Sequence, residues 1–183
     1  MAKKRIRVIL FGPQNSGKTS QGMLLSQHFD VPFIEAKSAL QDEIAQGTAM
    51  GKLVKEYLEA NVYAPDDLIN AVMLKHLKQA ADQGFVLDGY PRNIEQAESL
   101  DKIAKVQLAI QFKLGDEQSI QRLDKRFSED EARRKLALYH FMTEPIASYY
   151  RQRGVLLALN AGQTIEQLQE ELIKKMAKLG FKP

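Results

Sequence analysis

The chain has 183 residues, of which 44% are hydrophobic and 27% charged, and its formal net charge is +3. This length and composition fit one globular domain, and the absence of cysteine excludes disulfides and cysteine-bound zinc. Because the basic residues are scattered among 23 acidic ones without an aromatic-basic stripe, we expect no binding to nucleic acid.

The start of the chain does not fit a secretory signal. A basic segment, residues 1–5, precedes an apolar run, but Arg7 interrupts this run and Gly12 ends it. No stretch approaches the roughly 18 consecutive apolar residues that cross a bilayer. We therefore expect a cytoplasmic protein that does not bind a membrane.

Short apolar runs alternate with longer segments of helical periodicity along the chain, without repeats or linkers. The predicted strands are residues 5–11, 32–35, 85–88, 106–113 and 155–159. This alternation is typical of βαβ units and a parallel sheet, and nearly unbroken apolar strands indicate helices on both faces. We predict an α/β fold with an open five-stranded parallel sheet, formed by a single domain over residues 1–183.

Three of the predicted helices have recognisable features. Residues 65–67, Pro-Asp-Asp, are a typical helix start. Thr164 and Gln167 resemble a capping box at the start of the last helix. Residues 129–152 also have a helical pattern, and Pro145 is expected to kink or divide that helix.

The first predicted strand leads into a sequence that fits a phosphate-binding loop. Residues 12–19 match G-x-x-x-x-G-K-[ST] between a strand and an amphipathic helix. Glycines let backbone N–H groups turn toward phosphate oxygens, and the N-terminus of the following helix favours anions. Lys18 would bind the β- and γ-phosphates of ATP, and the hydroxyl of Thr19 or Ser20 would bind Mg²⁺. The candidate ATP-binding residues of the loop are Gly12, Pro13, Gln14, Asn15, Ser16, Gly17, Lys18, Thr19 and Ser20.

A second motif follows the third predicted strand, where residues 85–92 read F-V-L-D-G-Y-P-R. Asp88 ends the strand, at the place where a second carboxylate would hold Mg²⁺ through water. Arg92 lies just beyond the carboxyl end of the strand, where open α/β sheets bind ligands. The motif therefore indicates a second part of the same site.

An Asp-Gly-Tyr-Pro-Arg turn after a buried strand, in a chain with an early phosphate loop, resembles the adenylate kinases and related nucleoside-monophosphate kinases. The resemblance extends from about Arg5 to the C-terminus. Further matching pieces, in family order, are residues 43–52, 65–68, 92–97, 139–145 and 160–162. The resemblance implies a monomeric enzyme of the P-loop type that transfers the γ-phosphoryl group of ATP, with Mg²⁺, to AMP.

The resemblance also implies roles for individual residues. It places Arg92 on the acceptor phosphate, Gln96 at the adenine edge and Gln163 at the adenine of ATP. On the ATP side it adds Asp88, Arg122 and Gln163 to the phosphate loop. The implied acceptor-site residues are Ala36, Gln41, Val62, Tyr63, Ala64, Gly89, Arg92, Gln96 and Lys135. The implied catalytic cations are Lys18, Arg92, Arg122, Arg126 and one of Arg133, Arg134 or Lys135, with Arg133 as the first choice.

Two departures from the family pattern concern the acceptor. Ala36 and Gln41 stand where the family has a Thr that touches adenine and an Arg that grips the acceptor phosphate, and Lys37 is a nearby substitute cation. Ala36 and Asn93 also resemble the UMP/CMP kinases, whereas Gln96 favours adenine. AMP is the expected acceptor, and the alternatives are a UMP/CMP-type kinase or a nucleotide-binding protein with little turnover.

Other departures concern the loop and the lid. Gln14 and Asn15 replace a Pro and a Gly of the family's loop, and Asn tolerates the left-handed backbone conformation that the loop requires. An acceptor-binding insertion is expected at about 35–64 and a lid at about 123–133, too short for a hinged lid domain. Lys135 stands where the family has Arg, and its ammonium lacks the bidentate fork of a guanidinium.

Overall fold

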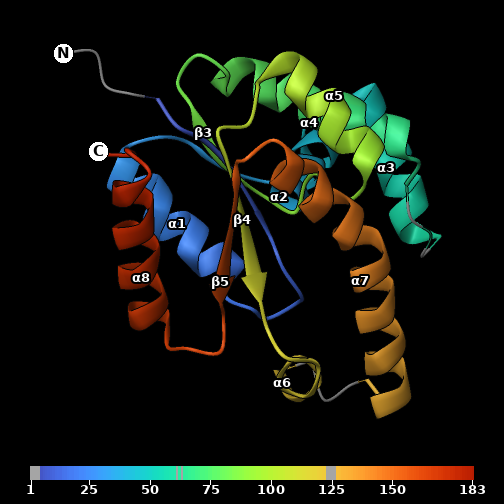
Figure 1. Cartoon of the computed structure of the whole chain (residues 1–183). Coiled ribbons are helices and arrows are strands. Elements are labelled where there is room, and N and C mark those ends of the chain that lie inside the picture. The colour runs from blue at the N-terminus through green and yellow to red at the C-terminus, as the bar shows by residue number, and fades with distance from the viewer. Residues whose placement is uncertain (1–4, 61, 63, 123–126) are drawn as a thin grey trace.

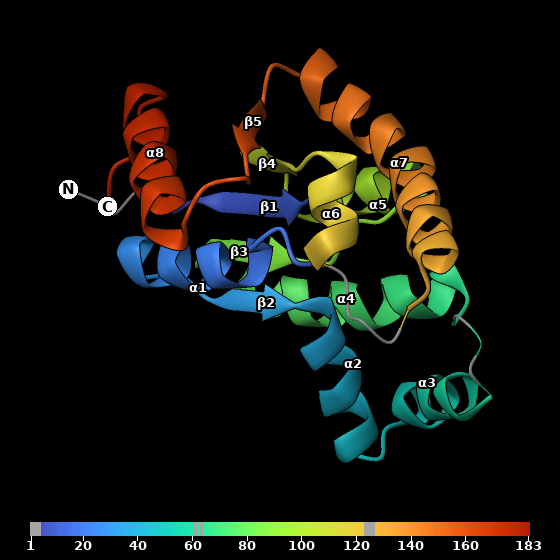
Figure 2. The ribbon, with the colours of Figure 1, turned by 90° about the horizontal axis from the view of Figure 1, so that it is seen from below.

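The computed structural model describes residues 5–60, 62, 64–122 and 127–183. Its centre is a parallel sheet (Figure 1), with the strand order β2-β3-β1-β4-β5, which Figure 2 shows. The five strands are β1 (Arg7–Phe11), β2 (Phe33–Glu35), β3 (Phe85–Asp88), β4 (Leu108–Lys113) and β5 (Leu156–Asn160). The prediction of an α/β fold with five parallel strands is confirmed, and each strand begins and ends within two residues of its predicted bounds.

Helices cover both faces of the sheet (Figures 1 and 2). One face is covered by α1 (Lys18–Phe29) and α8 (Ile165–Lys178), and the other by α4 (Asp66–Ala80), α5 (Ile94–Ile103) and α7 (Glu129–Gln152). Helices α2 (Ala36–Ala45) and α3 (Ala49–Glu59) project away from the sheet beyond β2, and α6 (Asp116–Arg122) follows β4. No helix in the described part of the chain is long and apolar enough to cross a membrane.

The alternation of side chains along β1 explains why the sheet has two cores. Successive residues of a strand point to opposite faces. Val8 and Leu10 pack in the core that includes α1 and α8, whereas Ile9 and Phe11 pack in the core under α4, α5 and α7. The apolar run of β1 is therefore buried on both sides, and its carboxyl end emerges between the two helical layers.

The predicted helix starts are confirmed, and of the two outcomes expected at Pro145, a kink or a division, the structure excludes the division. Pro65 is the N-cap of α4, and Thr164 and Gln167 form a capping box at the start of α8. Helix α7 continues through Pro145 as one helix of 24 residues, so the proline does not divide it. Proline removes one N–H donor, which leaves the carbonyl of Phe141 without its helical partner. Phe141 itself lies on the exposed side of the helix, with 77% of its surface accessible.

Candidate nucleotide-binding site

The segment between β1 and α1 has the backbone conformation of a tight loop. Asn15 and Gly17 have φ angles of 58° and 87°, in the left-handed region. Asn and Gly are the residues that adopt this region most readily, so Asn15 fits its place in the loop. At Gly12 a Cβ atom would lie 2.7 Å from the backbone oxygen of Phe112, so the start of the loop has no room for a side chain.

Lys18 lies folded against this loop. Its Nζ donates a hydrogen bond to the backbone oxygen of Pro13 at 2.8 Å. Burial lowers the pKa of Lys18, the nearby Asp88 carboxylate opposes this shift, and the Arg92 guanidinium lowers the pKa further. The loop also contains the Ser16 hydroxyl, which is buried and has no hydrogen-bond partner among the described residues. The loop thus holds one partly buried cation and one unpaired hydroxyl group.

The carboxyl end of strand β3 meets the phosphate loop at Thr19. The hydroxyl of Thr19 donates a hydrogen bond to Oδ2 of Asp88 at 2.7 Å, and Asp88 is 3% exposed at the end of β3. Burial raises the pKa of Asp88, and the Thr19 hydrogen bond and the Lys18 charge oppose this rise.

These oxygens have the chemistry that Mg²⁺ prefers. Mg²⁺ is usually bound by one or two carboxylates together with phosphate oxygens and water, rather than by a complete protein cage. The described residues contain no group of three or more His, Cys, Asp or Glu side chains that could hold a metal ion. Thr19 and Asp88 therefore fit an Mg²⁺ ion that is shared with a bound nucleotide.

Two arginines lie on either side of the loop. Arg92 follows the Gly89–Pro91 turn, and its Nε donates to the backbone oxygen of Gly89 at 2.9 Å. Arg122, at the end of α6, donates from Nη1 to the backbone oxygens of Ala161 at 3.1 Å and Asn15 at 3.4 Å. The Asn15 side-chain amide also donates to the backbone oxygen of Arg122. The structure thus brings together Lys18, Asp88, Arg92 and Arg122, four residues that the sequence indicated.

The cations at the start of α7 are placed differently. Arg133 pairs with Glu129 at 2.7 Å and with Glu117 at 3.4 Å, on an exposed surface. Lys135 lies over the ring of Phe127, 4.5 Å from its centroid. The structure therefore does not bring Arg133 or Lys135 into contact with the loop, and their roles stay predictions. Arg126 lies outside the described residues.

On the ATP side, Gln163 lies in the segment between β5 and α8. Its side-chain amide donates to the backbone oxygen of Asn160 at 3.0 Å and to Glu171 at 2.5 Å. The neighbouring Gly162 faces Gln118 of α6, whose side-chain oxygen would lie 3.2 Å from a Cβ atom there. The end of β5 and helix α6 thus lie side by side next to Arg122.

The predicted acceptor residues lie around β2, β3 and the start of α4. Ala36 is 3% exposed, and a Cβ atom at Gly89 would lie 3.4 Å from its methyl group, so Ala36 packs against the Gly89 turn. Gln41 is exposed on α2 and Val62 is exposed, while Ala64 is half-buried. Tyr63 lies outside the described residues.

Gln96 occupies a buried position under the Arg92 turn. It is 2% exposed, its Oε1 accepts from the backbone N–H of Arg92 at 2.7 Å, and its Nε2 donates to Asp66 at 2.6 Å. The contact with Asp66 was missed, because in the sequence Asp66 is recognisable only as an acidic residue at a helix start. No local pattern links two residues that are thirty positions apart.

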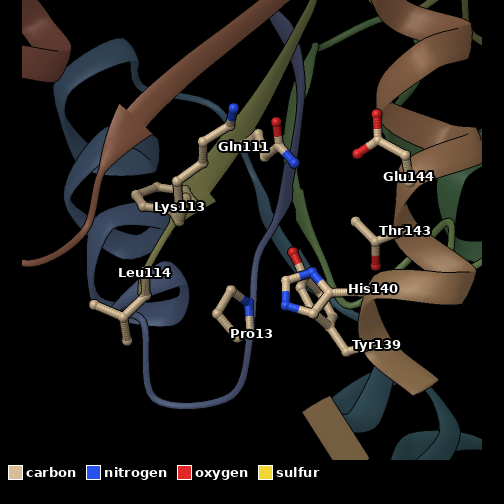
Figure 3. Close-up of a pocket in the computed structure, with 9 residues that line it drawn as sticks. Pro13, Gln111, Lys113, Leu114, Tyr139, His140, Thr143 and Glu144 are labelled. Carbon is tan, nitrogen blue, oxygen red and sulfur yellow. The ribbon is translucent and has the colours of Figure 1, made fainter. Parts of the chain in front are cut away.

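A cavity of about 250 Å³ opens beside the loop, between the end of β4 and α7 (Figure 3). Gln111 and Glu144 approach it from opposite sides, and the Oε1 atom of Gln111 is buried without a hydrogen-bond partner among the described residues. The residues that line the cavity are Pro13, Gln111, Phe112, Lys113, Leu114, Tyr139, His140, Thr143 and Glu144. Lys18, Arg92 and Arg122 do not line it, so the cluster of cations lies on the open edge of the sheet rather than in this cavity.

A phosphate loop, a carboxylate-hydroxyl pair and two guanidinium groups at the carboxyl edge of a parallel sheet define a phosphotransferase that acts on nucleotides. The sequence model of the family described as adenylate kinase matches residues 10–155. The chain belongs to the adenylate kinase family.

Curated relatives agree with this family. An adenylate kinase of Thermobifida fusca is 30% identical over 179 residues, which cover 90% of this chain and 95% of that protein. An adenylate kinase of Xanthomonas euvesicatoria pv. vesicatoria is 32% identical over 187 residues, covering 94% of this chain and all of the relative. An adenylate kinase of Symbiobacterium thermophilum is 31% identical over 208 residues, covering 91% and 96%. The similarity therefore extends over nearly the whole length of these proteins.

Proposed function

We propose that this chain transfers the γ-phosphoryl group of ATP to AMP and so forms two molecules of ADP. The observation that carries the proposal is the convergence of Lys18, Arg92 and Arg122 around one phosphate loop, next to the Thr19–Asp88 pair. The names of its curated relatives support AMP as the acceptor.

The chain's own residues would act mainly through position and charge. Phosphoryl transfer requires two nucleotides held in line and positive charge around the transferring group. Lys18 would exchange the Pro13 carbonyl for a phosphate oxygen of ATP, because a charged acceptor forms the stronger hydrogen bond. Arg122 would bind the ATP phosphates from the α6 side, and Arg92 would bind the acceptor phosphate from the β3 side.

The Thr19 hydroxyl and the Asp88 carboxylate would hold Mg²⁺, in part through water. When bound, the ion would neutralise charge on the phosphate oxygens. Asp88 serves this purpose in its ionised form: burial raises the pKa of Asp88 and disfavours this form, whereas the Thr19 hydrogen bond and the Lys18 charge favour it.

The surrounding segments have proposed roles as well. Helices α2 and α3, within the expected insertion at 35–64, would bind the acceptor, and the segment at about 123–133 would act as a short lid that excludes water. Arg126, Arg133 and Lys135 would add positive charge from this lid. A monomeric state, a cytoplasmic location and the absence of nucleic-acid binding stay predictions.

A coupled assay with Mg·ATP and a panel of monophosphates tests the proposal. We expect turnover with AMP and much less with UMP, CMP or dCMP. Turnover with pyrimidine nucleotides alone would instead identify a UMP/CMP-type kinase, which the buried Ala36 would then help to explain. Binding of ATP and AMP without turnover would identify a nucleotide-binding protein.

The variant Lys18→Ala tests whether the phosphate loop is the catalytic site. Removal of one hydrogen-bond donor that stabilises a transition state typically costs about 10²- to 10³-fold in rate, and Lys18 adds a charge, so we expect a loss of at least this size. The matched control is Lys178→Ala, which removes an exposed lysine near the end of α8. Equal activity in the two variants would show that the reaction does not use this loop.

A further inference from the structure

Asp66, the first residue of α4, receives hydrogen bonds from two side chains at the start of α5. Its Oδ2 accepts from the Asn93 amide nitrogen at 2.7 Å, and its Oδ1 accepts from the Gln96 amide nitrogen at 2.6 Å. Each carboxylate oxygen thus holds a different amide group. The two helices are joined at this point by one acidic residue.

This carboxylate determines which way both amides face. An ionised carboxylate only accepts hydrogen bonds, so each amide must turn its nitrogen toward Asp66 and its oxygen away. The oxygen of Asn93 then accepts from the backbone N–H of Gln96 at 2.9 Å, which caps α5. The oxygen of Gln96 accepts from the backbone N–H of Arg92 at 2.7 Å.

The chain of contacts ends at Arg92, whose guanidinium is the cation proposed to bind the acceptor phosphate. Gln96 is 2% exposed, so water cannot easily replace its hydrogen bonds and a wrongly turned amide would leave buried groups unpaired. Its bond to the Arg92 backbone holds the Gly89–Arg92 turn, within which the Arg92 guanidinium donates to the Gly89 carbonyl. Asp66 is thereby linked to Arg92 through Gln96.

We propose that Asp66 is a positioning residue for acceptor binding. Its carboxylate sets the orientation of the Asn93 and Gln96 amides and through them holds the Arg92 turn in its binding conformation. The proposal rests on the proposed function in one respect, namely that Arg92 binds the acceptor phosphate. Lys18 and Arg122 form no hydrogen bond with Asp66, Asn93 or Gln96 among the described residues, so a change at Asp66 should affect the acceptor rather than ATP.

The variant Asp66→Asn tests the proposal, with Asp67→Asn as its matched control. Both aspartates lie in the first turn of α4, so both variants remove one negative charge near the same helix N-terminus. Only Asp66 bonds to Asn93 and Gln96 in the described structure. We expect Asp66→Asn to raise the KM for AMP about 10- to 150-fold, the range typical of one lost charge-assisted hydrogen bond, and to leave the KM for ATP within about twofold. Asp67→Asn should leave both values within about twofold.

A second measurement does not depend on catalysis. The backbone N–H of Arg92 should exchange with solvent faster in Asp66→Asn than in the wild type, because its acceptor on Gln96 is no longer held in place. The exchange rate should not change in Asp67→Asn. If the wild-type protein failed to phosphorylate AMP, the proposed function would be wrong, and the exchange rates would still test the link from Asp66 to Arg92.

Two results would overturn the proposal. One is an Asp66→Asn protein that matches Asp67→Asn in the KM for AMP or in the exchange of the Arg92 amide. The other is a higher KM for AMP without faster exchange, since Asp66 would then act on the nucleotide directly. If Asp66→Asn did not fold, Asp66→Ser would be measured with the same expectations.

Discussion

Helix α2 and helix α6 are attached to neighbouring helices in opposite ways. Helix α2 is joined to α4 by Glu43, which is fully buried and accepts hydrogen bonds from Lys75 at 2.5 Å and from Thr48 at 2.6 Å. Helices α6 and α7 are joined by the pairs Arg133–Glu117 and His140–Asp116, whose side chains are all at least half exposed. In the first attachment the Glu43 carboxylate is hidden from water, although Lys75 is 41% exposed, whereas both partners of each pair in the second attachment face water.

The difference indicates which segment can rearrange when nucleotides bind. Breaking a buried ion pair leaves an uncompensated charge, whereas an exposed pair contributes little and is screened by salt. The packing around Glu43 is also tight, since a Cβ atom at Gly51 would lie 1.9 Å from the Glu43 backbone oxygen. We therefore expect α2, the start of α3 and α4 to stay together, and the contacts between α6 and α7 to exchange readily for contacts with phosphate.

Of the two attachments, the one through the buried Glu43 should have the larger effect, and this effect is on the free energy of unfolding. Glu43→Gln keeps the size of the side chain but removes the charge that Lys75 requires, and we expect a loss of about 1–3 kcal/mol in the free energy of unfolding. Denaturant unfolding measures this value. Glu56→Gln, at an exposed position on α3, is the matched control and should change the free energy of unfolding very little. Equal stability of the two variants would contradict a structural role for the buried charge.

The same pair predicts how stability depends on pH. Hydrogen bonds from Lys75 and Thr48 lower the pKa of Glu43 below its ordinary value of 4.5. A carboxyl group with a lowered pKa in the folded state adds stability above its unfolded pKa, and this contribution is lost as the pH falls through the folded pKa. The stability difference between wild type and Glu43→Gln should therefore be complete at neutral pH and shrink below about pH 4.5. Unfolding curves at several pH values measure the difference, and one that did not shrink in acid would contradict the pKa direction.

The fold and the centre of the site could be predicted because both depend on local patterns. The apolar runs predicted all five strands, and the G-x-x-x-x-G-K-[ST] spacing located the loop with Lys18 and Thr19. The resemblance to a family indicated Arg92 and Arg122, which do lie at the loop. Each of these features is carried by residues that are neighbours in the sequence.

The contacts between distant segments could not be predicted in this way. Glu43 and Lys75 are 32 positions apart, and each alone resembles an ordinary charged residue on a helix. The Asp66–Gln96 contact was missed for the same reason. Pro145 shows another limit, because a proline inside a helical pattern can kink or divide a helix, and only the structure shows that α7 continues through it.

The smallest effect should come from the exposed attachment, at Arg133. If Arg133 binds phosphate in the closed enzyme, it must first leave Glu117 and Glu129, and the loss of these pairs offsets part of what it gains. We therefore expect Arg133→Ala to lower kcat/KM for AMP by only about 3- to 10-fold, without a clear change in stability. The exposed Arg151, farther along α7 and paired with Glu144, supplies the control, Arg151→Ala, which should stay within about twofold of wild type. The variant Glu117→Gln makes the comparison sharper, since it frees Arg133 from one partner and should raise kcat/KM slightly at low salt, where the pair is least screened. If Arg133→Ala and Arg151→Ala had the same activity at low salt, Arg133 would belong to the surface of α7 and not to the site.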